Sequence, residues 1–284
     1  MLLNKTSAQK VVLVTGATGF IGQYVVNHLL QTTDHKIIVA ARGNNLPSAW
    51  QTNTRLKFKH FDFDNFDEAA NYFQYFDAPD TCIHLAWQGL PNYKDLFHFE
   101  KNLPQHYRFL KNLIVNGLPS LTVTGTCFEY GMQEGCLSVD MPCQPDNPYA
   151  LAKYTLYQFL VQLKKRFPFQ LNWPRLFYMY GHGQNPKSLY SQLEAAIERG
   201  DQEFNMSGGE QERDFLPVET VAENIVNLAT SNMETGLVNC CSGVPIKVKD
   251  WVENYIQSKA ATIKLNLGFY PYADYEPMRF WGKV

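Results

Sequence analysis

The chain has 284 residues, of which 45% are hydrophobic, and its formal net charge at pH 7 is -2. A chain of this length can bury a large core, in one domain or in two unequal lobes. The balanced charge argues against nucleic acid and anionic membranes as partners, and no apolar run approaches the ~20 residues that span a bilayer.

The cysteines and the N-terminal residues predict a cytoplasmic protein. The first ten residues are polar at positions 4–7 and lack the apolar core of a signal peptide. The chain shows neither a CxxC pair nor a ligand-like spacing of cysteine and histidine, so we expect free thiols and no metal site. The six cysteines stand at positions 82, 127, 136, 143, 240 and 241.

The first predicted strand, residues 11–15, leads into the glycine-rich segment TGATGFIG (15–22) and a helix predicted over 21–30. Strand, turn and helix in this order are typical of a dinucleotide site. The first glycine permits a tight turn, the second lets the backbone approach a pyrophosphate, and the third, Gly22, lets the helix pack against the strand. An ordinary strand–helix turn is the alternative, because the spacing is GxxGxxG. The predicted cofactor contacts in this segment are Gly16, Thr18, Gly19, Phe20 and Ile21, with the phosphates at the helix N-terminus.

The second predicted strand, 36–41, ends at Arg42. NAD sites place an acidic residue about 20 positions after the glycines to bind the ribose 2′-hydroxyl. A guanidinium at this place can instead pair with a 2′-phosphate. NADP(H) is therefore favoured, with NAD(H) as the alternative if Arg42 is a solvated loop residue.

The third and fourth strands are predicted over 56–61 and 81–85, with a helix over 66–76 between them. Asp62 could accept a hydrogen bond from the adenine amino group, and Asp64 is expected to cap the next helix. The fourth strand ends in HLAW (84–87), where His84 is expected to be a structural histidine. The predicted cofactor contacts at this strand end are Leu85, Ala86 and Trp87.

Strand and helix signals continue to alternate up to residue 174, which predicts a doubly wound parallel sheet, the Rossmann arrangement, with its ligand crevice at the strand C-termini. We expect residues 1–174 to form the NADP-binding domain and 175–284 a smaller substrate-binding lobe, with 215–245 returning to the first domain. The tail, 270–284, shows no closing helix. The remaining predicted helices are 97–116, 149–167, 188–199 and 218–230, and the remaining strands are 121–124 and 169–174.

Tyr149 and Lys153 stand four residues apart, on one face of a helix that begins after Pro148. A tyrosine is a poor acid or base near neutral pH unless its pKa is lowered, and a lysine cation nearby favours the phenolate. Lys153 can also bind the nicotinamide ribose. Thr126, which follows the strand 121–124, can donate a hydrogen bond to a substrate carbonyl or alkoxide. Taken alone, the Tyr–Lys spacing would be an ordinary helix surface.

These motifs together resemble the extended short-chain dehydrogenases/reductases of the NAD-dependent epimerase/dehydratase group, which act on nucleotide-linked sugars. The blocks that carry the resemblance are TGATGFIG (15–22), HLAW (84–87), Asn102, TGTCFEYG (124–131), YALAK (149–153), PRLFYMYGHG (174–183) and ERDFLPV (212–218).

The resemblance implies a catalytic triad of Thr126, Tyr149 and Lys153. It also implies a cofactor role for Asn102, a place beside the nicotinamide for residues 177–181, beginning with Phe177, and a contact between Arg213 and the nucleotide diphosphate. Family members commonly form homodimers through their fourth and fifth helices. Lys187 is a second positive group suited to a diphosphate.

The residues after Thr126 bear on the reaction. A 4,6-dehydratase needs an acid and a base at the places of Cys127 and Phe128, so dehydration is disfavoured. Cys127 could act as an acid at the substrate, although a small buried thiol is the simpler interpretation.

We therefore expect NADPH-dependent reduction of the C4 ketone of a nucleotide-linked 4-keto-6-deoxy sugar, as in the synthesis of bacterial surface polysaccharides. The alternatives are a nucleotide-sugar 4-epimerase with retained NAD and a non-catalytic NADP(H)-sensing regulator.

Overall fold

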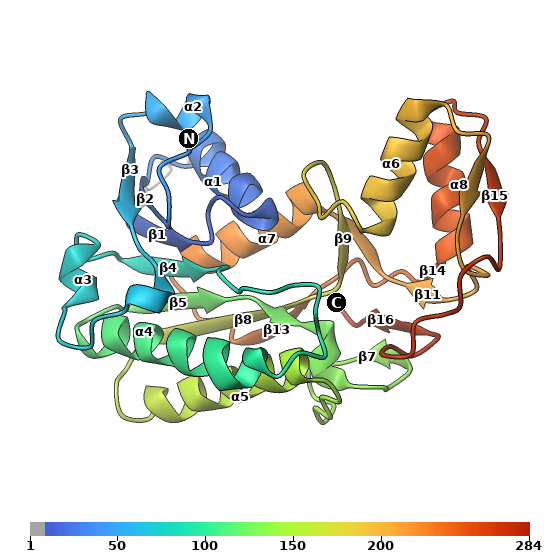
Figure 1. The fold of residues 1–284 in the computed structure, drawn as a ribbon. Helices are drawn as coiled ribbons and strands as arrows, with labels where there is room; N and C mark the ends of the chain where they lie inside the picture. The colour runs from blue at the N-terminus through green and yellow to red at the C-terminus, as the bar shows by residue number, and fades with distance from the viewer. Residues whose placement is uncertain (1–8) are drawn as a thin grey trace, which may run out of the picture.

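The computed structural model describes residues 9–284, which form an α/β fold with helices on both faces of a central parallel sheet (Figure 1). The N-terminal residues 1–8, on which part of the expectation of a cytoplasmic protein rests, lie outside this described range. Within it, no helix is long and apolar enough to cross a membrane.

The central sheet has the strand order β13-β8-β5-β4-β1-β2-β3, and all neighbouring strands run parallel. The order in which strands are added reverses between β1 and β4: β2 and β3 follow toward one edge of the sheet, and β5 and β8 toward the other. In doubly wound folds the ligand crevice forms at such a point, outside the carboxyl ends of the strands. The predicted doubly wound sheet is confirmed. Its strands are β1 (Val11–Thr15), β2 (Lys36–Ala41), β3 (Leu56–His60), β4 (Thr81–His84), β5 (Ser120–Val123), β8 (Gln170–Leu176) and β13 (Leu237–Cys240), and β6 (Gly125–Thr126) pairs with β8 beside them.

Alternating side chains of the strands build two cores, one on each face of the sheet. Val12 and Val14 of β1 face α1 and α7, whereas Leu13 between them faces α4 and α5. This period of two, with apolar residues on both faces, is what a parallel sheet covered by helices requires. The helices that cover the sheet are α1 (Phe20–Thr32), α7 (Val218–Thr230), α4 (Leu103–Val115) and α5 (Pro148–Lys164).

The predicted helix over 66–76 is wrong. The segment holds only one helical turn, α3 (Tyr72–Tyr75), after the 3-10 turn η1 (Phe63–Asn65). The Asp67 side chain accepts a hydrogen bond from the backbone N–H of Ala69 at 2.9 Å, and such a local bond competes with helix formation. Asp64 does not cap this segment, because it lies inside η1, which Asp62 caps, and the N-cap of α3 is Asn71.

The predicted helix over 97–116 begins with a wide π-helical turn, η2 (His98–Asn102), before α4 starts. Pro104 stands in the first turn of α4. A proline lacks the N–H and crowds the carbonyl four residues earlier, so the regular α-helical bonding cannot extend back through it. The remaining short turns of the first half are α2 (Ser48–Gln51) and the 3-10 turn η3 (Cys127–Tyr130).

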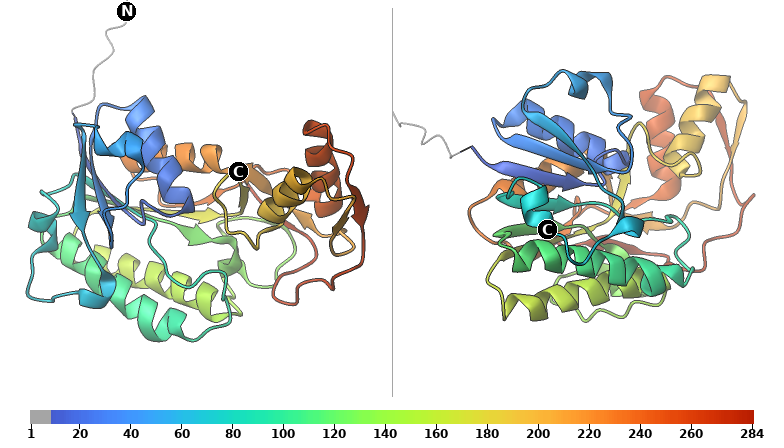
Figure 2. Two further views of the ribbon diagram at one scale, coloured as in Figure 1. Left: turned by 45° about the horizontal axis from the view of Figure 1, so that its top comes forward. Right: turned by 60° about the vertical axis from the view of Figure 1, so that its left-hand side comes forward.

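The C-terminal lobe has a core of its own, in which Trp251 and Val252 of α8 pack with Leu193 of α6 and with Phe204. Figure 2 shows these gold and red helices side by side, apart from the main sheet. Helix α8 was not predicted, although its apolar residues recur at helical spacing. The elements after β8 are β9 (Tyr178–Tyr180), α6 (Leu189–Arg199), β10 (Glu203–Asn205), β11 (Glu212–Arg213), β12 (Phe215–Pro217), β14 (Ile246–Lys247), α8 (Val248–Ser258), β15 (Lys264–Asn266) and β16 (Phe280–Gly282).

Several later segments return to the N-terminal part of the chain. Strand β13 pairs with β8, and α7 packs against α1. The end of the tail, β16, pairs in parallel with β7 (Gly135–Leu137), so the tail crosses the molecule after leaving the C-terminal lobe. The tail therefore lies beside both parts of the structure (Figure 1).

Candidate active site

The glycine-rich turn after β1 has no room for side chains at two of its positions. Gly16 has φ +70°, and a Cβ there would lie 2.6 Å from the backbone nitrogen of Ala86. A Cβ at Gly22 would lie 2.1 Å from the carbonyl oxygen of Gly16. Both neighbours are backbone atoms, so only glycine lets β1, β4 and α1 approach each other this closely.

The N-terminus of α1 is available to a ligand. Its N-cap residue is Gly19, and no side chain caps the helix. Thr18 and Gly19 are exposed, and Phe20 and Ile21 are half-buried. The first N–H groups of a helix have no partner within it and attract anions. The turn and the helix therefore fit the phosphates of a dinucleotide, as the sequence predicts.

Arg42 and Asp62 lie at the ends of neighbouring strands. Arg42 is exposed after β2, which pairs with β1 next to the glycine turn. The carboxylate of Asp62 already accepts hydrogen bonds from the backbone N–H of Asp64 at 3.1 Å and from the Asn65 side chain at 3.3 Å. The Arg42 side chain is therefore accessible to a ligand. The Asp62 carboxylate caps the turn that follows it, and a contact between Asp62 and adenine stays a prediction.

The end of β4 is held by buried histidines. His84 bonds to the Thr15 hydroxyl at 2.8 Å and to His106 at 2.9 Å, and burial lowers its pKa to about 3. A buried neutral imidazole with both nitrogens satisfied is a structural element, as expected for His84.

The loop that follows β4 is fixed by two further hydrogen bonds. Trp87 Nε1 donates to His98 Nδ1 at 3.0 Å, and Asn102 Nδ2 donates to the carbonyl of Gln88 at 3.0 Å. Leu85 and Ala86 are the residues that crowd Gly16. The predicted cofactor residues of this region therefore lie together along one loop beside the glycine turn.

Helix α5 presents Tyr149 and Lys153 from its first two turns. Asn147 caps the helix by accepting from the backbone N–H of Ala150 at 2.9 Å, and Pro148 follows in the favoured first position. Tyr149 is 8% exposed and Lys153 is 2% exposed. The Tyr149 phenol lies close enough to the Thr126 hydroxyl for Thr126 to lower its pKa, and the Lys153 ammonium lies 4.5 Å from the centre of a Trp87 ring. The structure thus brings the three predicted catalytic residues together.

Burial sets the protonation of this group. It raises the pKa of Tyr149 and outweighs the opposing effect of Thr126, because the phenol lies among aromatic rings and away from water. In the ligand-free protein the net shift of the Tyr149 pKa is therefore upward, and the expectation that Lys153 favours the phenolate stays a prediction. Burial lowers the pKa of Lys153 itself to about 8, against the charge of Glu129. The site holds a protonated phenol, which can act as a proton donor.

A cavity of about 860 Å³ opens beside these residues. It is lined by the loop after β4 and by the C-terminal lobe, and the residues that matter here are Tyr93, Phe128, Lys187, Arg213, Tyr275 and Glu276. Tyr149 lies directly behind Tyr93, since its backbone N–H donates to the Tyr93 carbonyl at 3.1 Å. Thr126 lies behind Phe128, whose N–H donates to the Thr126 hydroxyl at 3.3 Å. Tyr149 and Thr126 thus lie one layer behind the cavity wall formed by Tyr93 and Phe128 and do not line the cavity themselves.

Arg213 lines the cavity but is already paired. Its guanidinium is 2% exposed and forms an ion pair with Glu276 at 2.9 Å. Glu276 also accepts a hydrogen bond from the Tyr178 hydroxyl. Lys187, in contrast, is exposed at the cavity. Sequence reasoning missed Glu276, because the tail that carries it shows no recognisable motif.

Cys127 and Phe177 are buried away from the cavity. Both belong to a small core cluster with Tyr130, Leu137 and Phe280, and burial raises the pKa of the Cys127 thiol. This arrangement favours the interpretation of Cys127 as a small buried thiol. Its contact with substrate and that of Phe177 with cofactor stay predictions. Within residues 9–284 there is no group of three or more histidine, cysteine or acidic side chains that could hold a metal ion.

The doubly wound sheet, the glycine turn after β1 and the Tyr–Lys pair on α5 define an extended short-chain dehydrogenase/reductase. The chain belongs to the NAD dependent epimerase/dehydratase family, whose model matches residues 12–241.

Among curated proteins, the chain is similar to a dTDP-6-deoxy-L-talose 4-dehydrogenase (NAD(+)) of Aggregatibacter actinomycetemcomitans. The two are 29% identical over 272 residues, which cover 95% of this chain and 98% of the relative.

Solved structures show the same fold. A UDP-glucuronic acid 4-epimerase from Bacillus cereus, in complex with UDP-glucuronic acid and NAD, has a TM-score of 0.81 at 20% identity and covers 96% of this chain and 90% of its own. MoeE5 in complex with UDP-glucuronic acid and NAD has a TM-score of 0.79 at 24% identity, with coverages of 96% and 89%.

Proposed function

We propose that this protein transfers hydride between a nicotinamide cofactor and C4 of a nucleotide-linked sugar, in the direction that reduces a 4-keto-6-deoxy sugar. The observation that carries the proposal is the buried, protonated Tyr149 phenol, which lies near Thr126 and packs against Tyr93 in the cavity wall. The similar 4-dehydrogenase supports it, because oxidation of a C4 hydroxyl is the reverse of this step.

The residues present can complete a ketone reduction. Bound NADPH would supply the hydride. Thr126 donates a hydrogen bond to the C4 carbonyl oxygen, which becomes an alkoxide as the carbon receives the hydride. Tyr149 then gives its phenolic proton to that oxygen, so the ketone gains one hydride and one proton and becomes a hydroxyl. The phenolate that remains is stabilised by the Lys153 ammonium until it takes up a proton from solvent.

Four features of the chain fit a nicotinamide dinucleotide, and one of them, Arg42, supports NADP(H) ahead of NAD(H). The crowded glycine turn and the uncapped N-terminus of α1 fit the pyrophosphate, Lys153 fits the nicotinamide ribose, and exposed Arg42 fits a 2′-phosphate. The name of the similar 4-dehydrogenase specifies NAD(+), which favours NAD(H) as the alternative. The diphosphate of the sugar would meet Lys187 and, after exchange with Glu276, Arg213.

Thr126, Tyr149 and Lys153 would serve oxidation and reduction equally, so a 4-epimerase that retains NAD is the second candidate. A non-catalytic NADP(H) sensor is the third. We further propose a cytoplasmic homodimer, acting in the synthesis of a bacterial surface polysaccharide. The dimer contact is placed on α4 and α5, where Val115, Leu151 and Phe159 are exposed.

A product assay tests the proposal. The purified protein is mixed with NADPH and with dTDP-, CDP-, GDP- and UDP-linked 4-keto-6-deoxy hexoses, and absorbance at 340 nm and NMR follow both partners. We expect one of these sugars to gain a C4 hydroxyl as NADPH is consumed in equal amount. In a second arm with NAD+ and the corresponding C4-hydroxyl sugars, interconversion of two C4 epimers without net oxidation would indicate an epimerase. NADPH binding without oxidation in the first arm would indicate a sensor, and either result overturns the proposal.

Substitution of Tyr149 by Phe removes only the phenolic oxygen, so NADPH binding should persist while turnover is lost. Tyr154→Phe, one turn further along α5, is the matched control and should retain turnover. Near wild-type turnover of Tyr149→Phe would remove this residue from the mechanism.

A further inference from the structure

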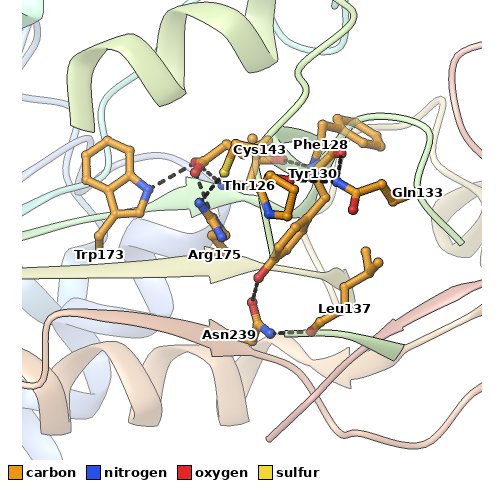
Figure 3. A network of polar contacts seen from close by, with 11 residues as sticks. Thr126, Phe128, Tyr130, Gln133, Leu137, Cys143, Trp173, Arg175 and Asn239 are labelled. Atoms are coloured by element: carbon orange, nitrogen blue, oxygen red, sulfur yellow. Dashed lines mark hydrogen bonds and ion pairs between the residues drawn. The ribbon is translucent and has the colours of Figure 1, made fainter. Parts of the chain in front are cut away.

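Glu129 is fully buried in the turn that follows Thr126. It is not one of the catalytic or binding residues predicted from the sequence. Its carboxylate accepts three hydrogen bonds: from the backbone N–H of Thr126 at 3.0 Å, from Trp173 Nε1 at 3.0 Å and from Arg175 Nε at 2.8 Å. Figure 3 shows Trp173 and Arg175 reaching from β8 toward the segment that carries Thr126. The carboxylate therefore joins the sheet to the backbone of a candidate catalytic residue.

The same contacts also set the direction of the Thr126 side chain. Thr126 and Glu129 form a capping box, in which the Thr126 hydroxyl oxygen accepts from the N–H of Phe128 while Glu129 holds the N–H of Thr126. Because its oxygen accepts from Phe128, the hydroxyl keeps its hydrogen for a partner outside the turn. Tyr149 lies near enough to Thr126 for the Thr126 hydroxyl to lower the pKa of the phenol.

A carboxylate is required at this position because its hydrogen-bond donors are held in fixed positions and cannot turn into acceptors. Arg175 is 1% exposed, and its Nη2 also lies 2.7 Å from Cys143 Sγ, so the guanidinium is fixed from both sides. A glutamine would have to present its NH₂ group to one of the three donors and would lose that contact.

We propose that Glu129 is a positioning residue of the active site, whose carboxylate fixes Thr126 so that its hydroxyl meets the Tyr149 phenol. The inference rests on the proposed function, in which Thr126 and Tyr149 act on the C4 oxygen. Glu129 itself is fully buried and does not line the cavity, so in this proposal it acts through Thr126.

The charge of Glu129 also acts on Lys153, since it opposes the decrease in the Lys153 pKa that burial causes. In the part of the chain that the structure describes, Lys153 lies over the rings of Trp87 and Trp173. The titratable groups that face it are Glu129, Tyr149, His84, His98 and His106, and burial lowers the pKa of all three histidines. Glu129 is the carboxylate among them, so its removal lowers the Lys153 pKa further.

Two substitutions separate position from charge. Glu129→Asp keeps the charge but shortens the side chain by one methylene, which withdraws the carboxylate from Thr126. Glu129→Gln removes the charge as well. We expect both to reduce kcat about 10- to 100-fold, as misplaced catalytic groups do, with both KM values within twofold of wild type. Only Glu129→Gln should shift the titration of Lys153 to lower pH, as followed by NMR of ¹³C-labelled lysine in the ligand-free protein.

Tyr130→Phe is the matched control. It removes the Tyr130 hydroxyl, which donates to Asn239 at 2.7 Å, from the same polar network and leaves in place the three donors of Glu129. It should keep the wild-type kcat even if it lowers the unfolding temperature. A wild-type kcat in folded Glu129→Asp would overturn the proposal, as would an equal loss in Tyr130→Phe.

The ligand-free protein gives a readout that does not depend on substrate. Crystal structures of wild type and Glu129→Asp should show a longer distance between the Thr126 and Tyr149 hydroxyl oxygens in the variant. An unchanged distance would overturn the positioning role. Absence of turnover by the wild type with every nucleotide sugar would instead count against the proposed function, and the crystallographic comparison would still decide the role of Glu129.

Discussion

The Tyr149 phenol and the Lys153 ammonium are both buried, and burial moves their pKa values in opposite directions. Each shift favours the neutral form, because a charge is poorly solvated inside the protein. For tyrosine the neutral form is the proton donor that ketone reduction needs. For lysine it is the form that cannot stabilise a phenolate. The pair therefore works over a pH range whose upper limit is set by the lysine.

We expect kcat/KM for reduction to be constant below pH 7 and to fall as pH rises through about 8, the pKa to which burial lowers Lys153. The sign follows from the ammonium, which is present below that pKa and lost above it. The kcat/KM profile reports groups of the free protein, so it is the quantity to measure. Lys165→Met, at the end of the same helix, should leave the profile unchanged, and a flat profile up to pH 10 would contradict the role of Lys153.

Arg42→Asp should reverse the preference between the two nicotinamide cofactors. The substitution removes a possible partner of the 2′-phosphate and adds a carboxylate that can accept from a 2′-hydroxyl. A charged hydrogen bond contributes about 1.5–3 kcal/mol, so the Kd for NADPH should rise about 10- to 150-fold. Fluorescence titration of both cofactors measures this.

Lys36→Asp makes the same change of charge at the other end of β2, where the side chain is also exposed, and should leave both Kd values unchanged. An Arg42 variant with wild-type NADPH affinity would show that this arginine is an ordinary loop residue.

At the level of elements, the sequence predicts best where local pattern and long-range packing agree. The β-branched strand 11–15 and the glycines after it combine strand propensity with close backbone packing, and both lie where expected. The region 66–76 is predicted to be a helix. Its phenylalanines and Tyr72 instead pack into the core cluster around Phe61 and Phe109, while Asp67 interrupts the helix. Tertiary packing of this kind leaves no local pattern in the sequence.

In the predicted site, too, residues with a local sequence pattern are predicted and residues placed by long-range packing are not. Thr126, Tyr149 and Lys153 carry recognisable spacing, and the structure brings them together. Glu276 reaches the cavity only because the tail crosses the molecule to pair β16 with β7. Nothing in residues 270–276 encodes that path locally. Glu129 stands within a quoted motif, but its role depends on Trp173 and Arg175, which lie more than 40 residues away.

The packing of α1 on its strand predicts the effect of Gly22→Ala. The new Cβ would lie 2.1 Å from the Gly16 carbonyl oxygen, between two backbone segments that cannot yield separately. We expect the free energy of unfolding to fall by about 1–3 kcal/mol, the usual cost of overpacking, together with weaker cofactor binding. Urea unfolding and cofactor titration measure the two effects.

Gly43→Ala introduces the same methyl group where no atom lies within 4 Å and serves as the control. Equal stability of the two variants would mean that α1 can move away from β1 without cost.

The molecule as a whole combines two parts with different tasks. The sheet and its helices hold the glycine turn and the candidate catalytic residues, whereas the C-terminal lobe and the tail line most of the cavity. Lys94 and Asp274 form an ion pair at 2.9 Å that joins the loop after β4 to the tail. A ligand in the cavity would therefore contact both parts at once.

The proposed dimer predicts that Phe159→Glu gives a monomer. Phe159 is 42% exposed on α5, and a carboxylate there would be desolvated in a contact between copies of α4 and α5. Light scattering after size-exclusion chromatography should show the mass of two chains for wild type and of one for the variant. Phe269→Glu, on a 56% exposed ring of the C-terminal lobe, should remain a dimer. A wild-type monomer would refute the proposed assembly.

The pairing of Arg213 with Glu276 has a consequence for selectivity. An anion that binds this guanidinium must displace the Glu276 carboxylate. The net binding free energy is then only the difference between the free energies of the new ion pair and the internal one. Small anions such as inorganic phosphate make no further contacts in the cavity and should leave the internal ion pair intact. A long ligand that also fills the rest of the cavity can compensate for the exchange, so the pair acts as a filter for size as well as for charge.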